Sequence, residues 1–363
     1  MIISIPLAAP LRRSNPSIAA RRFNLIGISN VDHKLYLWHL EDRNGPFLHT
    51  LNFWRVSPVL PTSWELFHLL KVPGIFTVAA ALSSDCRKVI VRLDYSMTGQ
   101  GVFTNMAEFL SLNLETLQVV RMPASTGLRA NINDRHYHSK ITNLRDTTDG
   151  LYGWEGEANS FYFVTPLWKL LPEADNPEVK SLAHHCNGRE LALSRTHLFY
   201  IRKANDDALL LNNLVVIELE NGSFIEKPLG QLMVGSLENR MLLASPDSGY
   251  LARYDYATKS TELLKILISA DLQLGLARVC RVPNFWYINA QKVTAGDGKI
   301  VTVFNECVTV IHVNVDSLKY LATWAVQKLF GKRGSENELV GGISENEFCE
   351  LFGYKSKKSV FFS

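Results

Sequence analysis

The residues best suited to metal or acid–base chemistry gather in Ser181–Lys203, which reads SLAHHCNGRELALSRTHLFYIRK. His184, His185 and Cys186 stand side by side, and imidazole and thiolate groups are ligands that zinc prefers in proteins. Neighbouring residues of a strand point to opposite faces of a sheet, so this run needs a sharp turn to converge on one ion. The Asn187-Gly188 pair makes such a turn, but a histidine that bonds to a β-turn explains the segment more simply. We therefore predict no bound metal.

A second cluster, NDRHYHSK, places His136 and His138 two residues apart, with Asp134 on the same face if the segment is extended. This spacing suits a metal site or a general base better than adjacent histidines do, and Arg135 would suit an anionic ligand. The surrounding segment 123–150 lacks a clear strand pattern, and long irregular loops in compact domains are often functional. We predict Arg135, His136 and His138 as partner-binding residues, against the alternative of a polar surface loop.

The segment RDTTDGLYGWEGEANS is rich in aspartate, glutamate and glycine. It does not fit a calcium-binding EF-hand, because Gly150 at the sixth position would put Arg145 at the first and Gly156 at the twelfth. Its carboxylates are candidate acids for glycoside hydrolysis, namely Asp146, Asp149, Glu155 and Glu157. An exposed aromatic side chain in a loop can anchor a partner, so Trp154 is our fourth predicted partner contact.

The composition is that of a globular protein, with 47% hydrophobic and 20% charged residues among 363. A net charge of +3 is too small to attract nucleic acid to the whole molecule. The five cysteines are scattered without a CxxC pair, which favours free thiols in the cytoplasm or another intracellular compartment. No apolar stretch reaches the ~18 residues of a membrane span. Phosphate-binding glycine loops, GxSxG and HExxH are absent, and we predict no cofactor.

The most informative pattern along the chain is a recurring strand, turn and strand. Apolar residues alternate with polar ones on both sides of a short Asn, Asp, Ser or Gly turn, which indicates a β-hairpin. These strand–turn–strand segments begin at Leu35, Phe109, Leu214, Tyr250 and Val308. Segments of a second kind, in which an apolar strand runs through a small polar turn into another strand, begin at Phe23, Phe76, Arg189 and Met241. We therefore expect antiparallel meanders, in six or seven units of the ~40–50 residues that a propeller blade uses.

At these hairpins the sequence resembles degenerate WD40-like β-propellers. The nearest piece is His184–Ile201, where a histidine, Asn187-Gly188, ELALS and LFYI are similar to a blade's turn and inner strands. The segment FNLIGISN…LYLW is similar in the same way. The Trp-Asp pair typical of the family is absent, and LWHLED and YIRKAND are its nearest equivalents. The resemblance implies a scaffold that binds proteins or peptides on a propeller face and is seldom an enzyme.

We predict an all-β fold, a degenerate six- or seven-bladed β-propeller with short helical insertions. The alternative is a multi-sheet β domain with a small C-terminal α/β part. Residues 1–22 would form a flexible N-terminal arm and 23–330 the propeller-like domain. Residues 331–363 would supply a C-terminal helix and strand that could close the propeller. Capping-box spacing predicts short helices at 62–70 and 343–353.

Two functions of different classes follow from these patterns. The first is a non-catalytic protein-interaction module, a scaffold or adaptor that binds a protein partner through loops on one propeller face. The alternative is a glycan-acting hydrolase on a β-propeller or β-sandwich that uses the loop carboxylates.

Overall fold

The computed structural model describes much of the chain. The described residues are 2–7, 23–42, 48–57, 64–73, 77–99, 102–121, 141, 143–154, 167–170, 190–203, 212–232, 240–269, 272–283, 292–296, 298–304 and 307–312. The chain divides into two compact units, Met1–Val313 and Asn314–Ser363. Every described residue lies in the first unit, so the helix expected at 343–353 lies outside the described residues.

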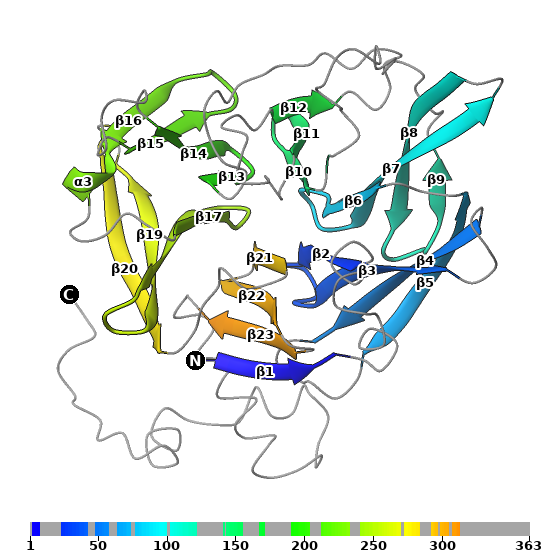
Figure 1. Cartoon of the computed structure of the whole chain (residues 1–363), viewed down its shortest axis with the longest axis horizontal. Helices are drawn as coiled ribbons and strands as arrows, with labels where there is room; N and C mark the ends of the chain where they lie inside the picture. The colour runs from blue at the N-terminus through cyan, green and yellow to red at the C-terminus, as the bar shows by residue number, and fades with distance from the viewer. Residues whose placement is uncertain are drawn as a thin grey trace, which may run out of the picture. The chain divides into compact units, whose positions relative to one another are not determined.

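The described strands form six antiparallel sheets, which are the blades of a propeller (Figure 1). Blade 1 contains β2 (Phe23–Ile28), β3 (Leu35–Asp42), β4 (Leu48–Val56) and β5 (Glu65–Pro73). Blade 2 contains β6 (Thr77–Leu82), β7 (Lys88–Gly99), β8 (Val102–Asn113) and β9 (Val119–Arg121). Blade 3 contains β10 (Asn143–Thr147), β11 (Gly150–Trp154) and β12 (Leu167–Leu170).

The second half of the ring repeats this plan. Blade 4 contains β13 (Leu191–Leu193), β14 (His197–Lys203), β15 (Asn212–Glu218) and β16 (Phe224–Pro228), followed by the short helix α3 (Leu229–Leu232). Blade 5 contains β17 (Arg240–Ala244), β18 (Gly249–Asp255), β19 (Ser260–Ile268) and β20 (Leu274–Pro283). Blade 6 contains β21 (Lys292–Gly296), β22 (Lys299–Phe304), β23 (Cys307–His312) and β1 (Ile2–Pro6). The predicted all-β propeller is confirmed, with six blades.

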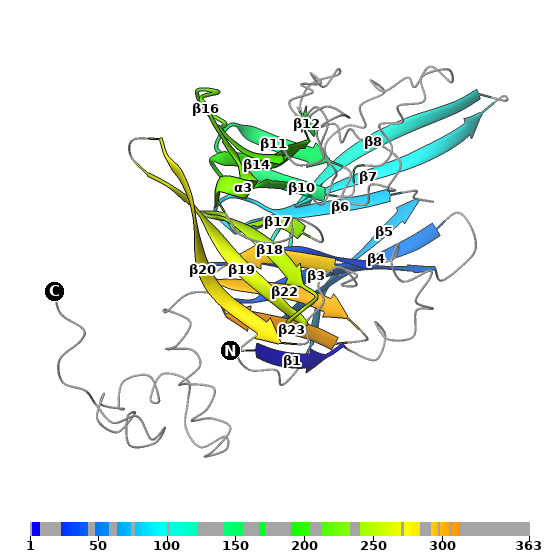
Figure 2. The ribbon, with the colours of Figure 1, turned by 60° about the vertical axis from the view of Figure 1, so that its left-hand side comes forward.

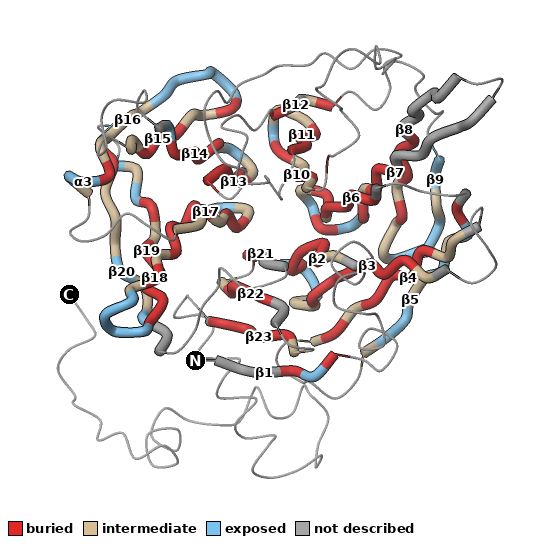
Figure 3. The backbone as a smooth tube through the Cα atoms, viewed as in Figure 1, coloured by how far each residue is buried: buried red, intermediate tan, exposed pale blue. Residues whose placement is uncertain are grey.

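The hydrophobic core lies between neighbouring blades, because most strands bury both of their faces. In β3, Tyr36 and Trp38 pack with Val89 and Val91 of blade 2 in one core cluster. Leu35, which points to the opposite face of the same strand, is also fully buried. Figure 3 shows buried residues concentrated in the first three strands of the blades and exposed residues along outer strands such as β5 and β9. The near-continuous apolar strands of the sequence thus reflect blades that are covered on both sides.

The N-terminal strand closes the ring. β1 pairs antiparallel with β23 and takes the outer position in blade 6, with Ile5 and Leu7 buried. Residues 1–22, which the sequence predicts as a flexible arm, therefore include a paired strand, and the helix and strand predicted for 331–363 lie outside the described residues. Blades 6 and 1 also meet at the centre, where a Cβ on Gly296 would lie only 3.0 Å from the carbonyl oxygen of Ile28. Glycine at this position allows the two inner strands to approach closely.

The predicted hairpins of blades 1, 2, 4 and 5 are confirmed, including the meander β17–β18–β19. The β7–β8 hairpin extends beyond the strands beside it (Figure 2). The helix predicted at 62–70 is wrong, because β5 begins at Glu65 and pairs with β4. The Glu65 carboxylate does not cap a helix. It accepts hydrogen bonds from Nε and Nη2 of Arg55 on the neighbouring strand, both at 2.7 Å.

Candidate functional site

The first strand of each blade faces the centre of the ring and ends in a tight turn (Figure 1). In the first five blades this turn begins with a buried hydroxyl residue, and these residues are Ser29, Ser83, Thr147, Ser194 and Ser245. The hydroxyl oxygens of the first four accept hydrogen bonds from backbone N–H groups of their own turns. Short hydroxyl side chains stabilise turns in this way. We call the surface formed by the turns 29–34, 83–88, 147–150, 194–197 and 245–248 the turn face.

Hydrogen bonds link consecutive turns of this face across the blade boundaries. The N–H of Ser84 donates to Oδ2 of Asp146 at 2.8 Å, which joins blades 2 and 3. The N–H of Thr148 donates to the carbonyl oxygen of Arg195 at 2.9 Å, which joins blades 3 and 4. The N–H of Arg195 in turn donates to the carbonyl oxygen of Pro246 in blade 5 at 2.8 Å. The centre of the turn face is therefore a connected backbone framework that can hold side chains in position.

The side chain of Arg145 on β10, in blade 3, forms hydrogen bonds with blades 4 and 5. Its Nε donates to the carbonyl oxygen of Leu193 on β13 at 3.0 Å, and its Nη2 donates to that of Ala244 on β17 at 2.7 Å. Burial lowers the pKa of the Arg145 guanidinium to about 10, so the group stays protonated at neutral pH. The residue as a whole is half-buried. Arg145 is therefore a deeply placed cation.

Arg195 provides a second cation in the next turn. Its backbone is fixed by the two hydrogen bonds to Thr148 and Pro246, and its side chain is partly exposed. Burial raises the pKa of the nearby Cys86 thiol, while a backbone hydrogen bond from Asn30 and the charge of Arg195 act in the opposite direction. The thiol also interacts electrostatically with Arg145. Cys86 therefore lies within electrostatic reach of both guanidinium groups.

Two carboxylates next to these arginines, Asp146 and Asp85, are engaged elsewhere. Asp146 follows Arg145 on β10 and bonds to blade 2, on the opposite side of the strand. Asp85 accepts hydrogen bonds from the Ser83 hydroxyl and from the N–H of Arg87. Among the described residues, no carboxylate oxygen lies within the 4.0 Å of an ion pair from Arg145 or Arg195. Arg145 on β10 and Arg195 in the turn 194–197 thus have no described acidic partner.

Residues from three segments that the sequence analysis considered lie outside the described part of the chain. These residues are Arg135, His136, His138, Glu155, Glu157, His184, His185 and Cys186. His197, which closes the opening histidine-rich segment, begins β14 and forms part of the turn after Ser194. The two paired strands predicted in that segment are confirmed as β13 and β14 of blade 4, while its Asn187-Gly188 turn lies outside the described residues.

The prediction of Trp154 as an exposed loop residue is wrong. Trp154 ends β11, is only 9% exposed, and packs in the core between blades 3 and 4 with Leu167 and Leu191. The glycines near Trp154 favour a loop in the sequence, but Gly150 and Gly153 lie within β11. A Cβ on Gly153 would come within 2.8 Å of Ile141, so this glycine serves close packing.

Two of the four carboxylates predicted for glycoside hydrolysis, Asp146 and Asp149, are described, and both form hydrogen bonds within the fold. Asp149 accepts a hydrogen bond from the Tyr152 hydroxyl and forms an ion pair with Lys169 at 2.8 Å. These residues belong to the β10–β11 hairpin, where the sequence had shown no clear strand pattern. Because each carboxylate already has a partner in or next to blade 3, the structure adds nothing in favour of a paired-acid site there.

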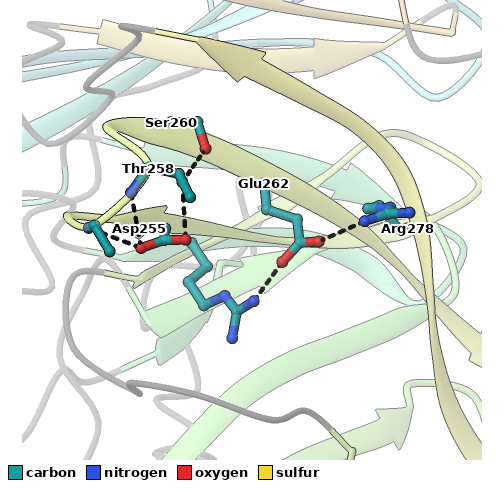
Figure 4. Close-up of polar contacts among 7 residues, drawn as sticks. Asp255, Thr258, Ser260, Glu262 and Arg278 are labelled. Carbon is teal, nitrogen blue, oxygen red and sulfur yellow. Dashed lines mark hydrogen bonds and ion pairs between the residues drawn. The ribbon is translucent and has the colours of Figure 1, made fainter.

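A further polar cluster lies in blade 5 (Figure 4). Asp255 accepts hydrogen bonds from the backbone and hydroxyl of Thr258, which lower its pKa, and Thr258 contacts Ser260 at 2.7 Å. The buried Glu262 carboxylate forms ion pairs with Arg253 and with Arg278, the latter at 3.8 Å. This cluster pairs its own acids with cations and hydroxyls, in contrast to the centre of the turn face.

Sequence reasoning did not single out Arg145 or Arg195. One signal was available, because each lies within two residues of a Ser or Thr that recurs from blade to blade. The segments RDTTDG, LSRTH and ASPDS all place such a residue where a first strand ends. Within the described residues there is no group of three or more His, Cys, Asp or Glu side chains able to hold a metal ion. No helix among them is long and apolar enough to cross a membrane.

The comparisons with known proteins bear on the fold alone. No family model and no curated protein matches the chain. Among solved structures, it is similar to Sqt1 from Chaetomium thermophilum at 9% identity and a TM-score of 0.38, over 78% of this chain and 69% of that one. It is similar to the β-propeller domain of the Trilobed protease from Pyrococcus furiosus at 9% identity and a TM-score of 0.40, over 81% and 82%.

A third similar structure is an acylaminoacyl peptidase from Pyrococcus horikoshii, at 8% identity and a TM-score of 0.42 over 77% of this chain. The match spans only 42% of the length of that peptidase. None of these similarities carries information about function. The described strands of the chain form a six-bladed β-propeller.

Proposed function

We propose that this propeller is a non-catalytic interaction module that binds a protein partner through its turn face. The observation that carries the proposal is the Arg145 guanidinium, which bonds to the carbonyl oxygens of Leu193 and Ala244. The half-exposed Arg195 lies in the turn after Leu193, and neither arginine has a described carboxylate partner. Arginine is enriched where proteins bind one another, because it combines charge with a planar set of donors. The hydrogen-bonded turns around it support the proposal, since a rigid frame lowers the entropy lost on binding.

An intracellular location belongs to the same proposal. Cys86, Cys280 and Cys307 are free thiols in the part of the chain that the structure describes. Free cysteines are typical of reducing compartments. The test is the redox state of the protein isolated from its host under acid quench.

Arg135, His136 and His138 remain predicted contact residues of the sequence, in the segment between β9 and β10. They compete with the turn face as the site of binding. The two possibilities differ in which substitution removes the partner, so both can be examined in one experiment.

The experiment is a quantitative affinity purification with the full chain, followed by direct binding to the purified partner. Arg195→Glu reverses one charge at the centre of the turn face, and a triple variant changes Arg135, His136 and His138 to Ala. Lys71→Glu is the matched control, because Lys71 is exposed on the outer strand β5. Loss of a directly binding partner with Arg195→Glu, but not with Lys71→Glu, supports the proposal. Equal capture by the wild type and Arg195→Glu contradicts it, and loss with the triple variant alone assigns binding to the segment between β9 and β10.

A further inference from the structure

We propose that Asn221 is a site of spontaneous deamidation, and that the carboxylate of Glu218 holds this reaction back while the protein is folded. Asn221 precedes Gly222 in the turn 219–223, which joins β15 to β16. This covalent change of the chain does not depend on binding of a partner.

The reaction joins the side chain of Asn221 to the next backbone nitrogen. The nitrogen of Gly222 loses its proton and attacks Cγ of Asn221, the bond from Cγ to Nδ2 breaks, and the amide group leaves as ammonia after it gains a proton. Water then opens the five-membered imide at either of its carbonyl groups and leaves aspartate or isoaspartate, with one new carboxylate. A glycine favours the attack because it has no Cβ to hinder the approach, and asparagine is a thermolabile residue.

The fold places this reactive pair in contact with solvent. Asn221, Gly222 and Ser223 are all exposed, and a Cβ on Gly222 would have no neighbouring atom within 4 Å. The backbone of Gly222 has a φ of 71°, a conformation that glycine adopts most readily. The turn therefore favours glycine directly after an asparagine, and water reaches both residues without any opening of the blade.

Hydrogen bonds occupy both reacting groups in the folded turn. The N–H of Gly222 donates to the backbone carbonyl oxygen of Glu218 at 3.0 Å. Nδ2 of Asn221 donates to Oε2 of Glu218 at 2.8 Å, and Oδ1 of Asn221 accepts from the N–H of Ser223 at 2.8 Å. The attack needs a free Gly222 nitrogen and a rotated Asn221 side chain, so these bonds must break first. Deamidation therefore starts from a locally opened turn.

Glu218 makes most of the contacts that keep the turn closed. Its carboxylate accepts from Asn221 and, at 3.1 Å, from the Ser223 hydroxyl, and hydrogen bonds to an ionised group are stronger than neutral ones. Its N–H donates to the carbonyl oxygen of Ser223 at 2.9 Å. Glu220 lies in the same turn and is exposed, but its carboxylate forms no hydrogen bond with the described residues of this turn. The two glutamates thus provide a test residue and a matched control.

The product of the reaction would weaken the same turn. Aspartate at position 221 lacks the Nδ2 donor and brings a second carboxylate next to that of Glu218, where like charges repel. The turn also contacts the turn face, since the N–H of Leu219 donates to the carbonyl oxygen of Thr196 at 2.9 Å. Deamidation would therefore loosen the start of β16 and its connection to the turn 194–197.

The test follows Asn221 by mass spectrometry of proteolytic peptides while the purified full chain is incubated at mildly alkaline pH. The variants are Glu218→Ala, which removes the carboxylate, and Glu220→Ala as the control. A synthetic peptide of residues 214–228 gives the rate without the folded turn. Circular dichroism checks that each variant is folded, and Glu218→Gln, which keeps an uncharged acceptor, takes the place of Glu218→Ala if that variant unfolds.

We expect the peptide to deamidate at Asn221 about tenfold or more faster than the folded wild type. Glu218→Ala should approach the rate of the peptide, Glu218→Gln should lie between the two, and Glu220→Ala should match the wild type. Equal rates in the wild type and the peptide overturn the inference. The same holds for an absence of conversion in the peptide, and for a Glu218 variant that reacts no faster than Glu220→Ala.

A product mimic tests the weakening of the turn. Asn221→Asp should speed hydrogen exchange at the amides of Gly222 and Ser223 relative to the wild type, while amides of the inner strand β13 should exchange as before. Unchanged exchange at Gly222 and Ser223 would contradict the effect assigned to the new carboxylate.

Discussion

Nε of Arg145 on β10 donates a 3.0 Å hydrogen bond to the carbonyl oxygen of Leu193 on β13, across the boundary between blades 3 and 4. The same side chain reaches Ala244 in blade 5, while the following residue, Asp146, bonds to blade 2. Only three strands of blade 3 are described, and its inner strand is held on both sides by these polar contacts. Two adjacent residues thus connect four consecutive blades at the centre of the ring.

Replacement of Arg145 by Met should lower the free energy of unfolding by about 2–4 kcal/mol, because it removes two charge-assisted hydrogen bonds and leaves two carbonyl oxygens without a partner. Arg195→Gln should change it by only about 0.5 kcal/mol, as expected for a surface substitution. Urea denaturation followed by circular dichroism measures both. Equal stability of the wild type and Arg145→Met would show that the crossing side chain does not stabilise the ring.

Gly249 on β18 lies against Phe199 of blade 4, and a Cβ on this glycine would come within 2.7 Å of the ring. Gly249→Ala should therefore destabilise the protein by about 1–3 kcal/mol through overpacking. The cost should shrink in a Phe199→Leu background, where the smaller side chain leaves room. Gly230→Ala is the control, because a Cβ at Gly230 would have no neighbouring atom within 4 Å and α3 favours alanine. Equal costs of Gly249→Ala in the two backgrounds would contradict the assigned contact.

Closure of the ring depends on β1, in which Ile5 is 1% exposed. Ile5→Ala should cost about 2–5 kcal/mol by loss of buried surface and creation of a cavity. Val31→Ala, at a residue that is 64% exposed, should leave stability almost unchanged. Chemical denaturation of both variants measures the difference, and a mild effect at Ile5 would argue against β1 as the closing strand.

Stability should fall as the pH is lowered from about 6.5, because burial lowers the pKa of His68 and of His197 in the folded protein. Between about pH 6.5 and the lower folded-state pKa values, the unfolded chain binds protons that the folded chain does not, so protonation favours unfolding. The free energy of unfolding measured from about pH 7.5 down to about pH 5 should therefore decrease. His68→Phe and His197→Phe should each flatten the curve, and the double variant should flatten it most. An unaltered curve in the double variant would assign the pH dependence to other groups.

Asp146 separates the two functions that the sequence left open. Asp146→Ala should cost about 1–3 kcal/mol, because it leaves the N–H of Ser84 without its acceptor. A catalytic acid would behave differently: Asp146→Asn would abolish hydrolysis of a glycan without loss of stability. Denaturation of both variants, beside activity on a panel of chromogenic glycosides, distinguishes these outcomes.

Local patterns in the sequence were sufficient for the strands and turns of most blades. Alternation around turns such as Ser83–Lys88 and Ser245–Ser248 predicts hairpins, because both the pattern and the turn residues act within a few positions. The blade number stayed open because blade 3 has short strands in a segment rich in glycine and acidic residues. The helix at 62–70 failed for a related reason: Glu65 has capping spacing, but its partner is Arg55 on the adjacent strand.

The sequence by itself determined the all-β class and the meander unit, since these follow from a repeat of local signals. It favoured a propeller of six or seven blades over a multi-sheet domain, and the structure decided for six blades. Only the tertiary structure decided that β1 closes the ring, that Trp154 is core, and that Arg145 reaches from blade 3 to blades 4 and 5. Arg145 meets carbonyl groups 48 and 99 residues away along the chain. No local pattern encodes such contacts, because they arise from the stacking of blades around a common centre.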